Sequence, residues 1–408
     1  MAAPESLSSY SPAHQLRRDV LSVAMLALAP AIALGFARFA YALILPDMSA
    51  DLGWSYADAG LMNTANAAGY LMGALLAARA INLAGSYRVM AVGVWACIAA
   101  LAICAVFRQA LPLNAARLLA GFGGGLAFVA GSVLATGIAQ RNPARAVFLL
   151  GLFYAGPGLG ILLSGLVVPI ILERLGPGSW KMAWAALSIL SVPLAIIRHF
   201  ARSESAAVHS PKSHKLNNGE MKWLLCGYLF FGAGYIAYMT FMIAWVQGNG
   251  GGAGFQALFW AAVGVAAMAS PWLWAGILKR QLHGRSFAVL TAITMIGAAL
   301  PLLPGGVPVL LASAALFGSA FFAVVAATTA FVRRNLPQEQ WASGIGMLTV
   351  VFGIGQMLGP IAIGFLNDQM RGLAGGLWAS VVLLGMATLI GLPQRDFATV
   401  ANQEPSVE

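Results

Sequence analysis

Hydrophobic residues in this chain form long unbroken runs, and polar residues are confined to the short segments between them. A run of about 20 apolar residues forms a helix that crosses the roughly 30 Å hydrocarbon layer of a bilayer. About twelve runs in the chain reach this length. The runs do not alternate between polar and apolar residues, as the strands of a membrane barrel do. The pattern therefore predicts an all-α integral membrane protein.

The predicted spans fall into two sets of six, separated by a polar stretch. The first set covers 20–45, 57–82, 87–107, 112–139, 145–173 and 180–199. The second set covers 222–247, 254–278, 286–304, 306–332, 339–366 and 373–393. The sequence thus predicts an N-terminal tail, a six-helix bundle, a linker, a second six-helix bundle and a C-terminal tail, at 1–19, 20–199, 200–221, 222–393 and 394–408.

Composition agrees with this interpretation, and charge orients the chain. Of the 408 residues, 60% are hydrophobic and 9% are charged, whereas a soluble domain has roughly 25% charged residues. Of the 23 lysines and arginines, 17 lie in one set of predicted loops and 4 in the opposite set. Short loops rich in Lys and Arg stay in the cytoplasm. The net charge of +10 is therefore a topology signal that places both termini in the cytoplasm, and it does not indicate nucleic-acid binding.

Two pairs of motifs recur between the predicted halves. The first span contains "GFARFAY" from Gly35, and the seventh contains "GAGYIAY" from Gly232. The fifth span contains "GPGLG" from Gly156, and the eleventh contains "GPIAIG" from Gly359. Two related six-helix halves are typical of secondary transporters.

These motifs make the chain similar to the major facilitator superfamily. Arg117 with the following "GFG", the Gly-Pro motif of the fifth span and the opening "GFARFAYALILPDM" carry the resemblance. The last of these resembles the YbfB/YjiJ-type bacterial branch. The resemblance implies twelve transmembrane helices in two pseudo-symmetric six-helix bundles, around a central cavity that opens alternately to each side.

The chain departs from the superfamily pattern at several positions. The loop after the second span contains Arg79 without the usual acidic residue, and its counterpart around Arg280 also has none. In the superfamily, salt bridges at these loops hold one side of the transporter closed. Without the acidic residues, such salt bridges cannot form here in the same way. The Gly-Pro motif of the fifth span resembles the G-P-x-x-G-G pattern that is typical of antiporters in this superfamily. Ile161 replaces the last glycine of that pattern, which weakens the indication of antiport.

Arg38 and Arg117 are the two basic residues inside predicted spans. Charged residues in membrane helices usually face the protein interior and mark a functional site. The alternative is a structural arginine that bonds to carbonyl groups or reaches the interface. No acidic residue lies deep in a span, and the nearest acids are shallow ones such as Asp47 and Asp58. Either a shallow acid titrates, or coupling does not use protons, or an anionic solute supplies the negative charge.

Further polar and aromatic residues are candidates for the cavity wall. Asn63, Asn66 and Tyr70 share one helix face, with bonding between helices as the alternative. An aromatic stripe in the seventh span includes Tyr235 and Tyr238, with packing as the alternative. The remaining candidates are Tyr41 and Gln356, and the residues expected to bend helices are Gly156, Pro157, Gly160, Gly359 and Pro360.

The sequence as a whole predicts a monomeric secondary transporter in the bacterial inner membrane, surrounded by lipid. It would move a small organic solute, with an anion favoured, by alternating access with Arg38 as the substrate or coupling charge. A coupling proton or other ion is a further expected partner. We expect no enzymatic activity, no cofactor and no metal site. The alternatives are a proton-coupled exporter of amphipathic compounds and a solute sensor that does not transport.

Overall fold

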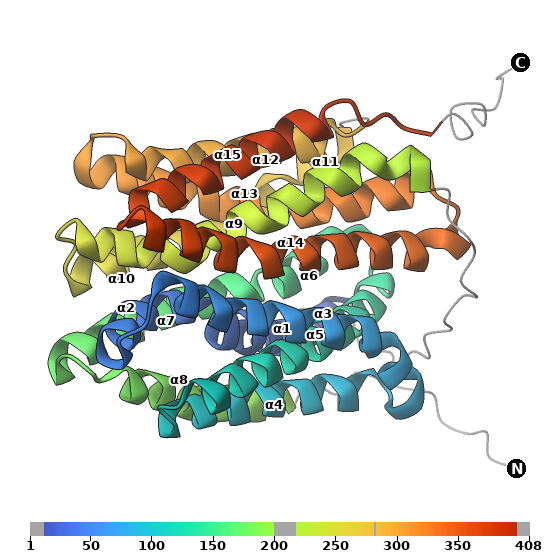
Figure 1. Cartoon of the computed structure of the whole chain (residues 1–408). Helices are drawn as coiled ribbons and strands as arrows, with labels where there is room; N and C mark the ends of the chain where they lie inside the picture. Colours follow the sequence, from blue (N-terminus) through green and yellow to red (C-terminus); the bar gives the residue numbers. More distant parts are fainter. Residues whose placement is uncertain (1–11, 200–217, 281–282, 398–408) are drawn as a thin grey trace, which may run out of the picture.

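The computed structural model describes residues 12–199, 218–280 and 283–397, which are almost entirely helical (Figure 1). Twelve helical segments in this part of the chain are long and apolar enough to cross a membrane. Their ends lie within a few residues of the predicted spans, except in the first segment. That segment runs from His14 to Leu52 and is longer than predicted at both ends. The prediction of twelve transmembrane helices is confirmed.

Helical elements outnumber spans because several spans are interrupted. The elements of the first half are α1 (Pro12–Pro30), the π-helix η1 (Ala31–Phe39), α2 (Tyr41–Leu52), α3 (Tyr56–Ala84), α4 (Ser86–Val106), α5 (Ala110–Gln140), η2 (Pro143–Arg145), α6 (Ala146–Tyr154), α7 (Gly156–Leu175) and α8 (Trp180–His199). Those of the second half are η3 (Asn218–Met221), α9 (Lys222–Gly248), α10 (Ala253–Leu273), α11 (Ala275–Arg280), α12 (Arg285–Ala299), η4 (Leu300–Leu302), α13 (Gly306–Asn335), η5 (Gln338–Gln340), α14 (Trp341–Gln369) and α15 (Leu373–Gly391).

The helices form two bundles that lie against each other (Figure 1). The blue-to-green helices α1 to α8 make up the lower bundle, and the yellow-to-red helices α9 to α15 make up the upper one. Between the bundles, α3 packs against α14 and α7 packs against α10. Most of the predicted linker, 200–217, lies outside the described residues, as do 1–11 and 398–408 of the predicted tails.

The first membrane span contains a break that the sequence analysis did not predict. Between α1 and α2 the chain forms the π-helix η1, and the N–H of Ala40 donates to the carbonyl of Gly35 at 2.9 Å. Gly35 lies directly against Gly160 of α7, where an added Cβ atom would come within 2.3 Å of a backbone atom. Only two glycines allow helices to approach this closely. The π-helical segment therefore lies where the first and fifth spans are pressed together.

The two Gly-Pro motifs have different local structures. The fifth span is interrupted before Gly156, where α6 ends and α7 begins. Gly359 and Pro360 lie within α14, which runs through both residues as one helix. Gly359 instead packs against α9, since an added Cβ atom would come within 2.3 Å of the Ala233 carbonyl. Glycine at this position allows the close packing of α14 on α9.

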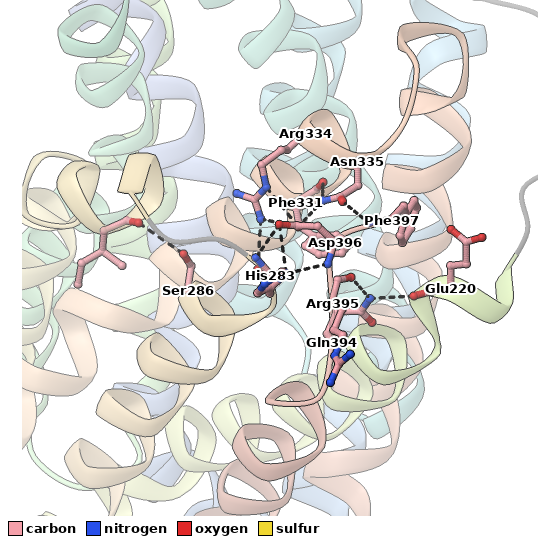
Figure 2. Close-up of polar contacts among 11 residues, drawn as sticks. Glu220, His283, Ser286, Phe331, Arg334, Asn335, Gln394, Arg395, Asp396 and Phe397 are labelled. Carbon is pink, nitrogen blue, oxygen red and sulfur yellow. Dashed lines mark hydrogen bonds and ion pairs between the residues drawn. The ribbon is translucent and has the colours of Figure 1, made fainter. Parts of the chain in front are cut away.

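Residues 394–397 are the described part of the C-terminal tail that the sequence predicts, and they are hydrogen-bonded to the second bundle (Figure 2). The Asp396 carboxylate accepts hydrogen bonds from the backbone N–H of His283 at 2.9 Å, from Arg334 at 3.2 Å and from Asn335 at 2.9 Å. Partial burial raises the pKa of Asp396, but these bonds and the Arg334 charge outweigh it and hold the pKa below its usual value. Gln394 donates to the Glu220 carbonyl, so this segment also joins α15 to the start of α9.

Candidate functional site

A cavity with a volume of about 60 Å³ lies between the two bundles. It is lined from the first half by η1, α3 and α5, and from the second half by α9, α13 and α14. The lining residues are Leu34, Arg38, Phe39, Tyr70, Phe128, Tyr235, Phe321, Phe322, Val325, Phe352 and Gln356. Seven of these eleven residues are aromatic, and Arg38 is the only charged one. The cavity is smaller than a typical ligand pocket of roughly 300 Å³ or more.

Arg38 is the central feature of the cavity wall. Its side chain is 4% exposed, and its Nε and Nη2 atoms have no hydrogen-bond partner among the described residues. Its guanidinium lies 5.0 Å from the centre of the Tyr70 ring and interacts with the hydroxyl of Tyr235. None of the ion pairs found in the described part of the chain includes Arg38. Aromatic faces thus offset part of the cost of burying this charge, and no carboxylate neutralises it.

Arg117 lies behind η1 and does not line the cavity. Its side chain is 1% exposed and donates to the carbonyls of Ala37 at 2.5 Å and Arg38 at 3.3 Å. Its guanidinium lies 4.8 Å from the centre of the Tyr41 ring. A π-helix leaves carbonyl groups poorly paired near its end, and Arg117 supplies donors to two of them. This geometry corresponds to the structural alternative considered for Arg117, and it fixes the backbone that carries Arg38.

The wall contributed by the second half is a set of stacked rings that ends in an amide. The Tyr235 ring stacks on Phe352 with centroids 5.6 Å apart and on Phe321 at 5.9 Å. Gln356 donates a hydrogen bond from Nε2 to the Tyr235 hydroxyl, and its Oε1 atom has no hydrogen-bond partner in the described structure. Arg38 from the first half and the hydrogen-bonded pair Tyr235 and Gln356 from the second half therefore line the same cavity.

The remaining predicted candidates lie away from the cavity. Tyr41 donates to the Ala59 carbonyl at 2.8 Å, within the first half. Asn66 donates to the Arg117 carbonyl, also within the first half. Asn63 crosses between the halves and donates to the Thr240 hydroxyl at 2.5 Å. In the second half, the hydroxyl of Tyr238 is hydrogen-bonded to that of Ser313 at 2.8 Å. Of the predicted set, the structure gathers Arg38, Tyr70, Tyr235 and Gln356 around the cavity.

Five phenylalanines of the cavity wall were not predicted. They are Phe39, Phe128, Phe321, Phe322 and Phe352. A phenylalanine in an apolar span has the same appearance in the sequence whether it faces lipid, a packed core or a cavity. The adjacent pair "FF" at 321–322 is the one local signal, and it does not by itself distinguish these environments.

The shallow acids considered as titrating groups are occupied in capping helices. Asp47 accepts from the backbone N–H groups of Gly178 and Trp180, both at 2.8 Å, at the start of α8. Asp58 forms a capping box with Ser55 at the start of α3. Neither residue lines the cavity. No group of three or more metal-binding side chains occurs within the described residues.

Solved structures of membrane transporters share this fold. A crystal structure of a variant of the nucleoside transporter NupG matches with a TM-score of 0.71, covers 93% of this chain and 98% of its own, and is 14% identical. A bacterial homologue of the human lysosomal transporter Spinster, in an inward-facing and unoccupied conformation, matches with a TM-score of 0.70. It is also 14% identical, and the match covers 97% of this chain and 100% of that one. At this identity the likeness shows the fold alone.

The family is established by a match of the sequence itself. The model for the family described as "Uncharacterised MFS-type transporter YbfB" matches residues 30–392, so the chain belongs to this family. No curated protein matches the chain significantly. The predicted resemblance is thereby confirmed: the protein is a multi-pass membrane protein of a transporter family, and such a family implies a small-molecule substrate.

Proposed function

We propose that this protein is a secondary transporter for a small organic anion, and that Arg38 binds the anionic group. The observation that carries the proposal is a buried guanidinium on the wall of the cavity between the bundles, with two nitrogen atoms that lack partners in the described structure. A buried cation without a counter-ion is costly. A carboxylate matches the planar donor geometry of arginine and offsets that cost.

The position of the cavity supports transport by alternating access. Its lining comes from both halves, so a bound solute contacts both bundles at once. In related folds the two halves rock around a site near the middle of the membrane. The charge distribution of the loops supports cytoplasmic termini, and we place the protein in the bacterial inner membrane. The aromatic wall also suits export of amphipathic compounds, which is the second candidate function.

Solute flux into proteoliposomes tests the proposal. Purified protein would be screened against carboxylates, amines and neutral solutes of similar size, in parallel with Arg38→Gln. Arg174→Gln is the matched control, because Arg174 is an exposed arginine at the end of α7. We expect flux of carboxylates that is lost in Arg38→Gln and retained in Arg174→Gln. Flux of amines alone, unaffected by Arg38→Gln, would overturn the proposal. Binding of carboxylates without any flux would instead identify a sensor.

A further inference from the structure

The residues of the cavity wall restrict the kinds of anion that the cavity would bind. One full positive charge is present, and the amide oxygen of Gln356 is an acceptor that would repel a second carboxylate. Seven of the lining residues carry aromatic rings. A dianion would leave one charge uncompensated among these rings, and a sugar or other polyol would lose many hydrogen bonds to water without replacement. A solute with one charge and a large apolar surface matches this composition.

The orientation of the rings points to a flat apolar body. The rings of Tyr228, Phe352 and Tyr235 lie nearly parallel, with interplanar angles of 10° and 6° between neighbours. Phe352 and Tyr235 belong to the cavity wall. Parallel rings offer faces for offset stacking of another ring, which contributes beyond the burial of area alone. The charge lies on the wall from the first half, and the stacked faces lie on the wall from the second half.

We propose that the substrate is an aromatic monocarboxylate whose carboxylate binds Arg38 and whose ring stacks on the Tyr235 and Phe352 side. This inference rests on the proposed function and specifies its substrate class. A solute bound in this way joins the two bundles through chemically different ends. Binding and closure of the bundles are then coupled, because neither half alone completes the site.

Binding of four small probes to the purified protein, measured by calorimetry, tests the substrate class. Benzoate has both features, cyclohexanecarboxylate lacks the aromatic ring, benzamide lacks the charge and phthalate has a second charge. We expect benzoate to bind about 3- to 10-fold more tightly than cyclohexanecarboxylate. Benzamide and phthalate are expected to bind at least about 10-fold more weakly than benzoate.

A matched pair of variants tests the stacking. Phe352→Leu should reduce the preference for benzoate over cyclohexanecarboxylate towards one. Phe331→Leu should leave the preference unchanged, because Phe331 is buried in the same bundle, packs on Phe397 and does not line the cavity. If cyclohexanecarboxylate binds as tightly as benzoate and both depend on Arg38, the aromatic class is wrong and the anion proposal stands. If benzamide binds as tightly as benzoate and Arg38→Gln has no effect, the proposed function itself fails.

A second, independent observation concerns how the bundles close at one end of the molecule. The Asp368 carboxylate, near the end of α14, accepts from the backbone N–H groups of Tyr56 at 2.8 Å and Ala57 at 2.9 Å. These are the first residues of α3, which has 29 residues and belongs to the other bundle. A carboxylate at a helix N-terminus satisfies unpaired N–H groups and interacts favourably with the helix dipole. We call this contact the α14–α3 latch.

The backbones beside the latch are also in close contact. An added Cβ atom on Gly364 of α14 would come within 2.4 Å of the Tyr56 carbonyl, and one on Gly60 of α3 would come within 2.3 Å of the Pro360 carbonyl. Further along α3, the hydrogen bond from Asn63 to Thr240 of α9 again crosses between the bundles. The latch therefore lies at the rim of a closed seam between the halves.

We infer that the α14–α3 latch holds this end of the transporter closed and that its release opens the seam. Asp47 provides a control of the same chemistry, because it accepts from two backbone N–H groups at the start of α8 within a single bundle. Loss of either carboxylate removes a helix cap. Only loss of Asp368 removes a cap that joins the two bundles.

Labelling of a cysteine in the seam tests the latch. The reporter is Thr240→Cys in a Cys226→Ser background, where the remaining Cys97 and Cys104 are buried. We expect Asp368→Ala to raise the rate of maleimide labelling of the purified protein by about 5- to 30-fold, and Asp47→Ala to leave it nearly unchanged. An unchanged rate in Asp368→Ala, or an equal rise in both variants, would overturn the inference.

Discussion

The two related segments "GFARFAY" and "GAGYIAY" begin from the same pattern and reach different structures. In the first half the segment ends a π-helix and presents Arg38 to the cavity. In the second half it lies within the continuous α-helix α9 and presents Tyr235 to the same cavity. Equivalent positions of the two halves, Arg38 and Tyr235, thus give the cavity a charge on one wall and an aromatic ring on the other.

The largest expected effect is on benzoate affinity, and it comes from placing a tyrosine at position 38, as at the equivalent position 235 of the second half. Arg38→Tyr should weaken binding of benzoate by about 10- to 100-fold, because it removes the only charge that lines the cavity. Tyr235→Phe keeps the ring and removes a hydroxyl, so this variant should bind benzoate at most about 10-fold more weakly. Calorimetric titration measures both. Equal losses in the two variants would contradict the division of roles between the walls.

The next largest effect concerns the glycines that open the two segments. An added Cβ atom on Gly35 would come within 2.3 Å of the Gly160 backbone, whereas one on Gly232 would meet its nearest atom, the Phe352 carbonyl, at 2.7 Å. Overpacking of this kind costs about 1 to 3 kcal/mol. Gly35→Ala should therefore lower the thermal unfolding midpoint more than Gly232→Ala. The reverse order would show that the π-helix does not depend on this close approach.

A smaller effect is expected at the tyrosines that close the two segments. Tyr41 and Tyr238 are each hydrogen-bonded within their own bundle and do not line the cavity. Replacement of either by phenylalanine should cost about 0.5 to 1.5 kcal/mol of stability. Benzoate affinity should stay unchanged in both variants. A marked loss of affinity in Tyr41→Phe would return this residue to the candidate site, where the sequence had placed it.

The smallest effect lies far from the cavity, at the segment after α15 (Figure 2). The folded state holds the pKa of Asp396 below its usual value. The carboxylate therefore contributes stability that is present above its unfolded pKa of about 4 and is lost as the pH falls through the lower folded pKa. Thermal midpoints of the wild type and Asp396→Asn should differ near neutral pH and converge in acid. If the two thermal midpoints differed by the same amount at neutral and acid pH, the charge of Asp396 would not be the source of the stability.

The membrane spans and the burial of Arg38 could be predicted from the sequence because lipid imposes a simple rule. Long apolar runs must be helical, and a charge within such a run requires a reason. The π-helix could not be predicted from local sequence, because it lies where Gly35 contacts Gly160, and these residues are 125 positions apart in the chain.

The aromatic residues of the cavity wall and the contacts of Arg117 could not be predicted from the sequence for a related reason. Phe352 and Phe128 lie in apolar spans where any large side chain is compatible with lipid, so only their placement reveals the cavity. Arg117 has the same sequence signature as Arg38. Its donors meet the carbonyls of Ala37 and Arg38 only because α5 packs behind η1.

The central claim is that Arg38 is a buried cation without a counter-ion among the described residues, and that it binds an anionic solute. Thermal unfolding of the wild type and Arg38→Met, each with and without benzoate, tests it most directly. The account predicts that Arg38→Met is at least as stable as the wild type without benzoate, because an unpaired buried charge has been removed. Benzoate should then raise the midpoint of the wild type alone. A less stable Arg38→Met that benzoate stabilises as much as the wild type would contradict the account.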